Sequence, residues 1–294
     1  MTMSLWETIG TDIETATGKQ AVLNPRGSVG GGCINQAMRM QYGDATYFVK
    51  LNNASQVDMF AAEARGLQEL IGSHTLRVPE PVCWGEDGQS AWLVMEYLEL
   101  GGRSAPAALG EGLASMHRVT QESFGWVQDN TIGSTPQLNT WSNDWIGFWR
   151  EQRLRFQLEL AARHGHEGQL LSRGEQLLEE FPKLFDGYSP QASLLHGDLW
   201  SGNCAATRAG EPVIFDPAVY YGDREADLAM TELFGGFGGA FYSAYENDYP
   251  LDTGYTVRKT LYNLYHILNH LNLFGGGYHS QAQGMIDLLL GELR

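Results

Sequence analysis

The sequence is poor in cysteine. Its 294 residues include only three cysteines, at positions 33, 83 and 204, and they form neither a CxxC pair nor a Cys/His ligand pattern. An odd number of widely spaced cysteines argues against a disulfide framework, and the missing ligand pattern argues against a zinc site.

Basic residues are also few. Lysine and arginine together number 19 against 35 aspartates and glutamates, which gives a formal net charge of −16. A chain of this charge repels phosphate backbones and anionic lipid, so we expect it to bind neither nucleic acid nor a membrane surface. If it binds a nucleotide, local cations or a metal ion must neutralise the phosphates.

Long apolar runs are absent as well. No uninterrupted run approaches the roughly 20 residues that cross a bilayer, and the first residues, Met-Thr-Met-Ser-Leu-Trp-Glu, lack a basic segment followed by an apolar one. With 43% hydrophobic and 11% aromatic residues, the composition is typical of a globular protein. We therefore expect a cytoplasmic location.

The hydrophobic pattern changes near residue 100. Before it, the predicted segments are a helix at 4–17, strands at 20–29, 33–41 and 45–51, a helix at 55–72, and strands at 80–85 and 90–97. After Gly101-Gly102 the predicted segments are helices at 105–118, 141–164, 167–182, 225–247, 254–274 and 280–293. This order predicts an α+β protein of two domains, residues 1–98 and 99–294.

The most informative motif is His-Gly-Asp-Leu-Trp-Ser-Gly-Asn at residues 196–203. Asp198 and Asn203 are five residues apart, and Asp216 follows thirteen residues later at the end of a predicted strand. In kinases, one Asp in this order accepts the proton of the substrate hydroxyl, while the Asn and the later Asp hold metal ions at the nucleotide phosphates. Turn-forming and strand-capping roles are the alternative. The combination favours phosphoryl transfer with Mg²⁺.

The first third of the chain contains the other parts of such a site. Lys50 ends a predicted strand and Glu63 lies thirteen residues later on the next helix, so the pair can hold the lysine against phosphates, although such residues are more often simply solvated. The loop with Gly30, Gly31 and Gly32 offers backbone N–H groups to an anion, or is a plain hairpin turn. No Walker A pattern occurs, which argues against a P-loop NTPase.

The apolar strand at residues 93–98 runs into the Gly101-Gly102 break. At this point we predict a hinge in which Met95, Glu96 and Tyr97 present backbone groups to adenine. An ordinary core strand is the alternative.

Several motifs together resemble the fructosamine kinase (ketosamine 3-kinase) family. They are Gly-Gly-Cys-Ile-Asn at 31–35, the motif at 196–203, Phe-Asp-Pro at 215–217, Tyr-Gly-Asp-Arg-Glu-Ala-Asp-Leu-Ala at 221–229, and Leu-Tyr-His-Ile-Leu-Asn-His-Leu-Asn-Leu-Phe-Gly at 264–275. The resemblance implies a two-lobed protein-kinase-like fold, close to aminoglycoside and choline phosphotransferases. Its antiparallel sheet and one key helix form the N-terminal lobe, and the C-terminal lobe is mainly helical.

The family resemblance also implies an activity. Members phosphorylate the sugar 3-hydroxyl of ketosamines with ATP, and the unstable product leaves its amine, which repairs glycated protein. In this sequence Asp198 would be the base, Asn203 and Asp216 the Mg²⁺ ligands, and Lys50 the phosphate contact, with residues 95–97 at the adenine.

Two further residues have open interpretations. The indole of Trp200, two residues after the base, can form a wall for the C–H face of a sugar, or it can be core packing. Asp227 can brace the catalytic loop by accepting its N–H groups, or it can be a solvated acid at a helix start. Pro217 directly follows Asp216, so we expect no phosphorylated activation loop before the next helix.

Cys33 follows three glycines in the predicted phosphate loop. Oriented N–H groups there favour a thiolate, which predicts a redox-sensitive thiol and, on oxidation, a Cys33-linked dimer of an otherwise monomeric protein. A small, half-buried apolar role is equally consistent.

Two other functions stay open beside ketosamine phosphorylation. One is a kinase of another hydroxyl compound, resembling an aminoglycoside or choline; the other is a redox-sensitive nucleotide-binding pseudokinase. The intact set argues against the pseudokinase; its members are Lys50, Glu63, Asp198, Asn203 and Asp216.

Overall fold

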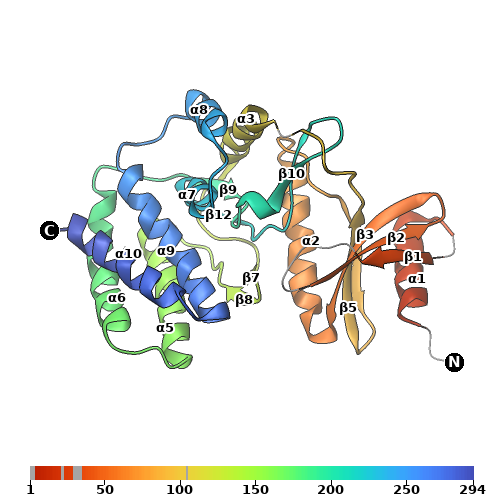
Figure 1. Cartoon of the computed structure of the whole chain (residues 1–294), viewed down its shortest axis with the longest axis horizontal. Helices are drawn as coiled ribbons and strands as arrows, with labels where there is room; N and C mark the ends of the chain where they lie inside the picture. The colour runs from red at the N-terminus through yellow and green to blue at the C-terminus, as the bar shows by residue number, and fades with distance from the viewer. Residues whose placement is uncertain (1–3, 21–22, 29–34, 104) are drawn as a thin grey trace. The chain divides into compact units, whose positions relative to one another are not determined.

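The computed structural model describes residues 4–20, 23–28, 35–103 and 105–294 (Figure 1). The chain forms two compact units. Unit 1 consists of residues 1–105 and 205–217, and unit 2 of residues 106–204 and 218–294.

These bounds differ from the predicted division between residues 98 and 99. Residues 99–105 and 205–217 join unit 1 because backbone hydrogen bonds connect them: the N–H groups of Gly101 and Gly102 donate to the carbonyl of Ala206, and that of Arg208 donates to Glu99. A hairpin far along the sequence is thereby attached to the strand-rich unit.

Unit 1 is built on a five-stranded antiparallel sheet in the order β1-β2-β3-β5-β4. The strands are β1 (Leu23–Ser28), β2 (Gln36–Tyr42), β3 (Ala45–Asn53), β4 (Pro81–Glu86) and β5 (Ser90–Glu96), and the helices are α1 (Leu5–Thr17) and α2 (Val57–Gly72). Every strand and helix predicted before residue 98 is confirmed, with ends shifted by a few residues.

The two helices of unit 1 cover opposite faces of the sheet (Figure 1). Successive side chains of a strand point to opposite faces. Val49 of β3 joins Ile9 and Ile13 of α1 in one apolar core, whereas its neighbour Lys50 meets Glu63 of α2. The apolar alternation of β3 thus brings the lysine to the α2 face.

Residues 205–217 form a hairpin in unit 1. Its strands are β10 (Cys204–Ala206) and β11 (Pro212–Ile214), and Val213 forms a parallel bridge with Arg77. This hairpin leads directly to Asp216.

Unit 2 is mainly helical. Its helices are α3 (Pro106–His117), α4 (Trp145–Trp149), a π-helical turn (Arg150–Arg155), α5 (Phe156–Arg163), α6 (Gln169–Glu180), α7 (Glu225–Leu233), α8 (Gly239–Asp248), α9 (Tyr255–Phe274) and α10 (Tyr278–Glu292). Its strands are β6 (Thr120–Gln121), β9 (Ala192–Leu195) and β12 (Tyr220–Gly222) in one sheet, and β7 (Asn130–Ile132) paired with β8 (Thr135–Gln137). Within the described ranges, no helix is both long and apolar enough to cross a bilayer.

Helix α9 is the centre of unit 2. It packs against α5, α7 and α10, and most of its length is buried, including Tyr262 and Tyr265. A helix that is buried on several sides is expected at the middle of a helical core.

The single helix predicted at 225–247 is wrong. The structure has α7 and α8 there, separated by a loop in which Gly235, Gly236 and Gly238 have φ angles of 108°, 72° and 85°. Because these left-handed conformations favour glycine, the glycine cluster ends one helix and begins the next.

The segment between Asp216 and α7 is short, as expected. Residues 217–224 contain β12, whose Tyr221 pairs with Leu194 of β9. A long activation loop does not separate Asp216 from α7.

Candidate active site

Lys50 joins two carboxylates in unit 1. Its Nζ lies 2.5 Å from Oε1 of Glu63 on α2 and 2.6 Å from Oδ1 of Asp216 after β11. The lysine side chain is 8% exposed and that of Glu63 11%, whereas that of Asp216 is 42% exposed. The buried ammonium is therefore held from one side by α2 and from the other by a carboxylate that reaches solvent.

The electrostatics keep the lysine charged. Burial alone would lower the pKa of Lys50, but the carboxylates of Asp216 and Glu63 outweigh it, so the pKa lies above its usual value. Burial raises the pKa of Glu63, and Lys50 opposes that rise. A permanently charged ammonium beside an accessible carboxylate suits the binding of a phosphate with its metal ion.

Asp216 has an unusual backbone conformation. Its φ is 57°, in the left-handed region that few residues other than glycine adopt, although aspartate adopts it more readily than most. This turn at the end of the β10–β11 hairpin accompanies the ion pair with Lys50. Local conformation and charge together fix the carboxylate.

Asp198 and Asn203 meet within one loop of unit 2. The Nδ2 of Asn203 donates to the backbone carbonyl of Asp198 at 2.8 Å and to its Oδ2 at 3.1 Å. The loop thus closes on itself through the two predicted residues.

Asp227 braces this loop from α7. Its Oδ2 accepts the N–H of His196 at 2.7 Å and its Oδ1 accepts that of Gly197 at 2.8 Å. The residue is 1% exposed, so the structure favours the brace over a solvated helix-start acid. Burial would raise the pKa of Asp227, but the hydrogen bond from His117 and those from the loop N–H groups hold it below its usual value.

The backbone of the loop requires a glycine at position 197. Its φ is 82°, and a Cβ there would lie 2.0 Å from the backbone oxygen of Ala218. That approach is enforced by the hydrogen bond from Ala218 N–H to the His196 carbonyl, at 2.8 Å. No larger residue fits before Asp198 without moving the loop.

Trp200 lies on the surface of unit 2. It is 38% exposed, and its ring contacts Phe234 at the end of α7, with centroids 6.1 Å apart. A Cβ on Gly202 would lie 2.3 Å from the indole. The indole therefore packs over Gly202, where a larger residue would clash with it. The rest of the ring is exposed to solvent.

The comparisons with known proteins agree with this arrangement. The family model of the fructosamine kinases matches residues 5–292. The chain belongs to the fructosamine kinase family.

The similarity of this chain to other proteins of the family extends over almost its whole length. The Synechocystis sp. protein named "Probable ketoamine kinase slr1563" is 48% identical over 97% of each chain. The Arabidopsis thaliana protein named "Protein-ribulosamine 3-kinase, chloroplastic" is 46% identical over 94% of this chain and 86% of its own. A Haemophilus somnus 129PT protein described as "Putative fructosamine-3-kinase" has a crystal structure with a TM-score of 0.89 and 28% identity, over 97% of each chain. The predicted α+β, kinase-like fold is confirmed.

The predicted hinge of this family member lies at the end of β5. The N–H of Glu96 donates to the Glu80 carbonyl at 2.9 Å, and its carboxylate accepts from Arg77 at 2.5 Å. Met95 pairs with Phe48 of β3, and Tyr97 follows the strand under the guanidinium of Arg39. Since the N–H of Glu96 is engaged and Met95 pairs with strands on both sides, Tyr97, which follows β5, is the better candidate for a backbone contact with a base.

The glycine loop cannot be placed in the same way. Gly30, Gly31, Gly32 and Cys33 lie outside the described residues, so the phosphate loop and the redox-sensitive thiol stay predictions. The other two cysteines, Cys83 and Cys204, are free thiols.

The oxygen donors of the predicted site residues suit magnesium. In the part of the chain that the structure describes, no three His, Cys, Asp or Glu side chains gather as a metal cage. Asp216 and Asn203 offer carboxylate and amide oxygens, and Mg²⁺ at kinase sites takes few protein ligands beside phosphate oxygens and water. Unit 1, with Asp216, and unit 2, with Asn203, thus each carry a donor of the kind that Mg²⁺ takes.

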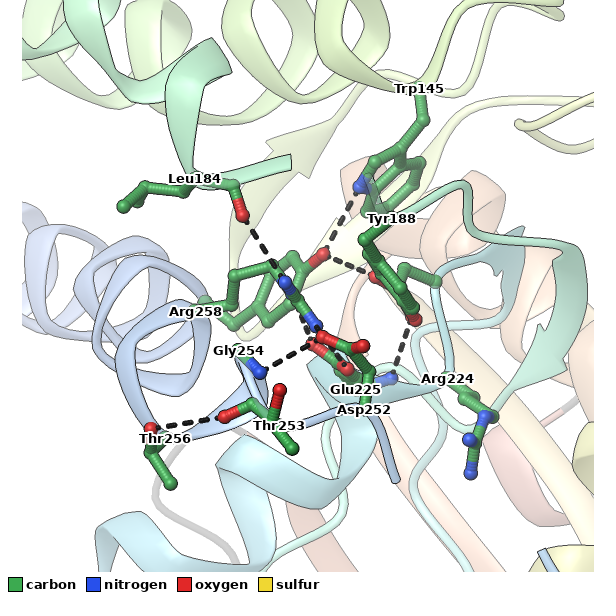
Figure 2. A network of polar contacts seen from close by, with 12 residues as sticks. Trp145, Leu184, Tyr188, Arg224, Glu225, Asp252, Thr253, Gly254, Thr256 and Arg258 are labelled. Atoms are coloured by element: carbon green, nitrogen blue, oxygen red, sulfur yellow. Dashed lines mark hydrogen bonds and ion pairs between the residues drawn. The ribbon is translucent and has the colours of Figure 1, made fainter. Parts of the chain in front are cut away.

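Sequence reasoning missed a buried polar network that holds the start of α7 (Figure 2). Arg258 of α9 binds both carboxylate oxygens of Glu225, at 2.8 and 2.9 Å, and Asp252 at 2.6 Å. Asp223 accepts from the hydroxyls of Tyr188, at 3.0 Å, and Tyr262, at 2.5 Å. These contacts fix the first turn of the helix that carries Asp227.

A second missed chain of hydrogen bonds ends on Asp227. Arg224 donates to the hydroxyl of Tyr245 at 3.0 Å, and that hydroxyl lies 2.8 Å from Nδ1 of His117. Nε2 of His117 lies 3.2 Å from Oδ2 of Asp227. Burial lowers the pKa of His117, so the imidazole is neutral, and one tautomer fits: Tyr245 donates to Nδ1, and Nε2–H donates to Asp227.

Proposed function

We propose that this protein transfers the γ-phosphoryl group of ATP to the 3-hydroxyl of a ketosamine, free or bound to protein. The proposal rests on two clusters of charged and polar side chains, one around Lys50 and the other around Asp198. Lys50 is held by Glu63 and Asp216, and Asp198 is held by Asn203 in a loop braced by Asp227. Phosphoryl transfer depends mainly on positioning and charge stabilisation, which these contacts supply.

Each residue has a distinct task in this proposal. Asp198 accepts the proton of the sugar hydroxyl at its carboxylate as the hydroxyl oxygen attacks phosphorus. Lys50 binds phosphate oxygens, and Asn203 with Asp216 would hold Mg²⁺. When bound, the metal neutralises charge on the phosphates. The predicted hinge at residues 95–97 would contact adenine, chiefly through the backbone of Tyr97, and the predicted glycine loop would cover the phosphates.

Trp200 supports a sugar as acceptor. Its indole is 38% exposed two residues after Asp198. The flat apolar face of an aromatic ring suits the C–H face of a sugar. The names of the relatives, ketoamine kinase and protein-ribulosamine 3-kinase, support the same substrate class. Phosphorylation at the 3-hydroxyl would make the adduct leave its amine, so the reaction would reverse glycation.

The test is ADP release with a panel of acceptors. The panel contains a fructosamine, a ribulosamine and an erythrulosamine of the same amine, one aminoglycoside and choline, each with Mg²⁺ and ATP. We expect release with ketosamines and none above background with the other two. Release with only the aminoglycoside or only choline would show that the acceptor is that compound and not a ketosamine. No release with any member of the panel would favour the pseudokinase.

The matched control is Asp198→Asn, which keeps the size of the side chain. Loss of the base should lower kcat by roughly 10²–10⁴-fold. A variant that keeps more than about half of the turnover would show that the measured activity does not use Asp198.

A further inference from the structure

We propose that an aromatic surface extending from Trp200 binds the polypeptide side of a protein-bound ketosamine. This surface, the aromatic strip, consists of Trp200, Phe234, His270, Phe274 and Tyr278. The inference rests on the proposed function and deepens it, because it makes protein-attached adducts the preferred substrate.

The strip is continuous. The ring of Trp200 contacts Phe234 at 6.1 Å between centroids, Phe234 contacts His270 at 5.0 Å, and His270 contacts Phe274 at 5.6 Å. Tyr278 lies 5.1 Å from the same His270 ring. The rings come from the catalytic loop, from the residue that directly follows α7, and from α9 and α10, so four separate parts of unit 2 contribute to one surface.

Both ends of the strip are open to solvent. Trp200 is 38% exposed and Phe274 56% exposed. The three rings between them are half-buried, which anchors the strip to unit 2. Single exposed apolar residues are ordinary on protein surfaces, whereas connected ones mark interaction sites. A ring as open as Phe274 contributes little to the core.

The local structure explains why Phe274 stays in place. His270 and Phe274 are four residues apart in the last turn of α9 and therefore lie on one face of the helix. Nδ1 of His270 is 2.8 Å from the carbonyl of His266, which can only accept, so Nδ1 carries the hydrogen and the ring orientation is fixed. Gly275, with φ of 64°, ends the helix, and α10 begins at Tyr278, with α9 and α10 side by side (Figure 1).

The chemistry of the strip selects its occupant. Burial lowers the pKa of His270, so all five rings are uncharged and offer flat apolar faces. The adduct of a small amine ends close to the sugar, at the site of Trp200. A lysine-bound adduct continues through a methylene stem into a polypeptide, which extends roughly 3.3–3.6 Å per residue. With neighbouring rings 5.0–6.1 Å apart, a few residues reach Phe274.

The experiment compares two acceptors that carry the same sugar. One is the ketosamine of a short primary amine, and the other is the same adduct on the central lysine of a nonapeptide. The variant is Phe274→Ser, and its matched control is Leu288→Ser on α10, because both wild-type side chains are 56% exposed. Neither substitution touches Lys50, Asp198 or Asp216. Melting temperatures of both variants verify the fold.

We expect Phe274→Ser to raise KM for the glycated peptide about fivefold, the loss of one aromatic contact, without changing kcat. KM for the small ketosamine should stay at the wild-type value, and Leu288→Ser should change neither. Equal KM values of Phe274→Ser and Leu288→Ser on the peptide would overturn the strip, as would an equal rise on both acceptors. If wild type releases ADP with neither acceptor, the proposed function itself fails, and the strip with it.

Discussion

The ammonium of Lys50 lies between two carboxylates that differ in access to solvent. Glu63, at 2.5 Å, is nearly buried, and Asp216, at 2.6 Å, is 42% exposed. An ion pair that is half open to solvent contributes little to stability, whereas its buried partner strongly constrains the lysine. Glu63 therefore holds Lys50 from the buried side, and the carboxylate of Asp216 holds it from the side that reaches solvent.

The first prediction separates metal binding from proton transfer. Replacing Asp216 with Ala removes the carboxylate proposed as a metal ligand, so Mg²⁺ should no longer tighten ATP binding. Asp198→Asn should bind ATP as wild type does, with and without Mg²⁺. Calorimetry of ATP binding in both conditions measures the difference. Identical behaviour of the two variants would contradict the division of roles.

How much of this site is readable from the sequence depends on how far apart its residues lie. Lys50 and Glu63 belong to neighbouring elements, so strand alternation and helical spacing bring them together. Asp198, Asn203 and Asp216 lie within nineteen residues of one another, so the sequence alone shows their order and spacing.

Contacts over long separations could not be predicted in this way. His117 and Tyr245 are 128 residues apart, and Arg258 and Glu225 are 33 apart on different helices. A buried histidine or arginine has no local signature, because its partners come from other elements. The role of Asp227 stayed open for the same reason. The break between α7 and α8 is different, because the glycines at 235–239 are a local signal for the end of a helix.

The second prediction concerns Asp227 as the brace of the catalytic loop. In Asp227→Asn one oxygen becomes an NH₂ group that faces backbone N–H donors, so at least one hydrogen bond to His196 or Gly197 is lost. A lost hydrogen bond to a buried charged group costs about 1.5–3 kcal/mol of stability. Because the loop carries Asp198, kcat should also fall, while KM for ATP should stay near its wild-type value.

Denaturant unfolding and steady-state kinetics measure both effects. Glu246→Gln on the exposed surface of α8 is the control, and it should change neither quantity. Wild-type kcat in a destabilised Asp227→Asn variant would restrict Asp227 to a structural role.

The third prediction concerns the ion pair of Arg258 and Glu225, whose side chains are 2% and 0% exposed. Arg258→Leu leaves Glu225 without its partner, and removal of one member of a buried pair typically lowers the free energy of unfolding by about 3–5 kcal/mol. Replacing both, in Arg258→Leu with Glu225→Leu, should restore part of that loss, because no unpaired carboxylate stays buried. Urea unfolding of wild type and of the two variants tests this order. A double variant less stable than Arg258→Leu would show that Glu225 holds α7 by other contacts.

The last prediction is a pH dependence of stability that comes from buried histidines. Burial lowers the pKa of His266 to about 3, and the nearby His270 adds to that effect. The pKa of an unfolded histidine is about 6.5. Between these values the unfolded chain binds a proton that the folded protein does not, so stability is fully present above pH 6.5 and is lost as the pH falls toward 3. The loss is about 1.4 kcal/mol per pH unit for one such group.

Buried acids act in the opposite direction, since burial raises the pKa of Glu225 to about 7 and that of Asp223 as well. The contribution of His266 is therefore measured as a difference between the pH slopes of wild type and variants. The free energy of unfolding is measured in urea from pH 6 to 4.5 for wild type, for His266→Asn, and for His164→Asn on the exposed surface as control. The slope of the free energy of unfolding against pH should be less positive in His266→Asn than in the other two proteins, by about 1.4 kcal/mol per pH unit. Equal slopes, or an imidazole NMR signal of His266 that titrates near pH 6.5 in the folded protein, would show that this histidine is charged in the fold.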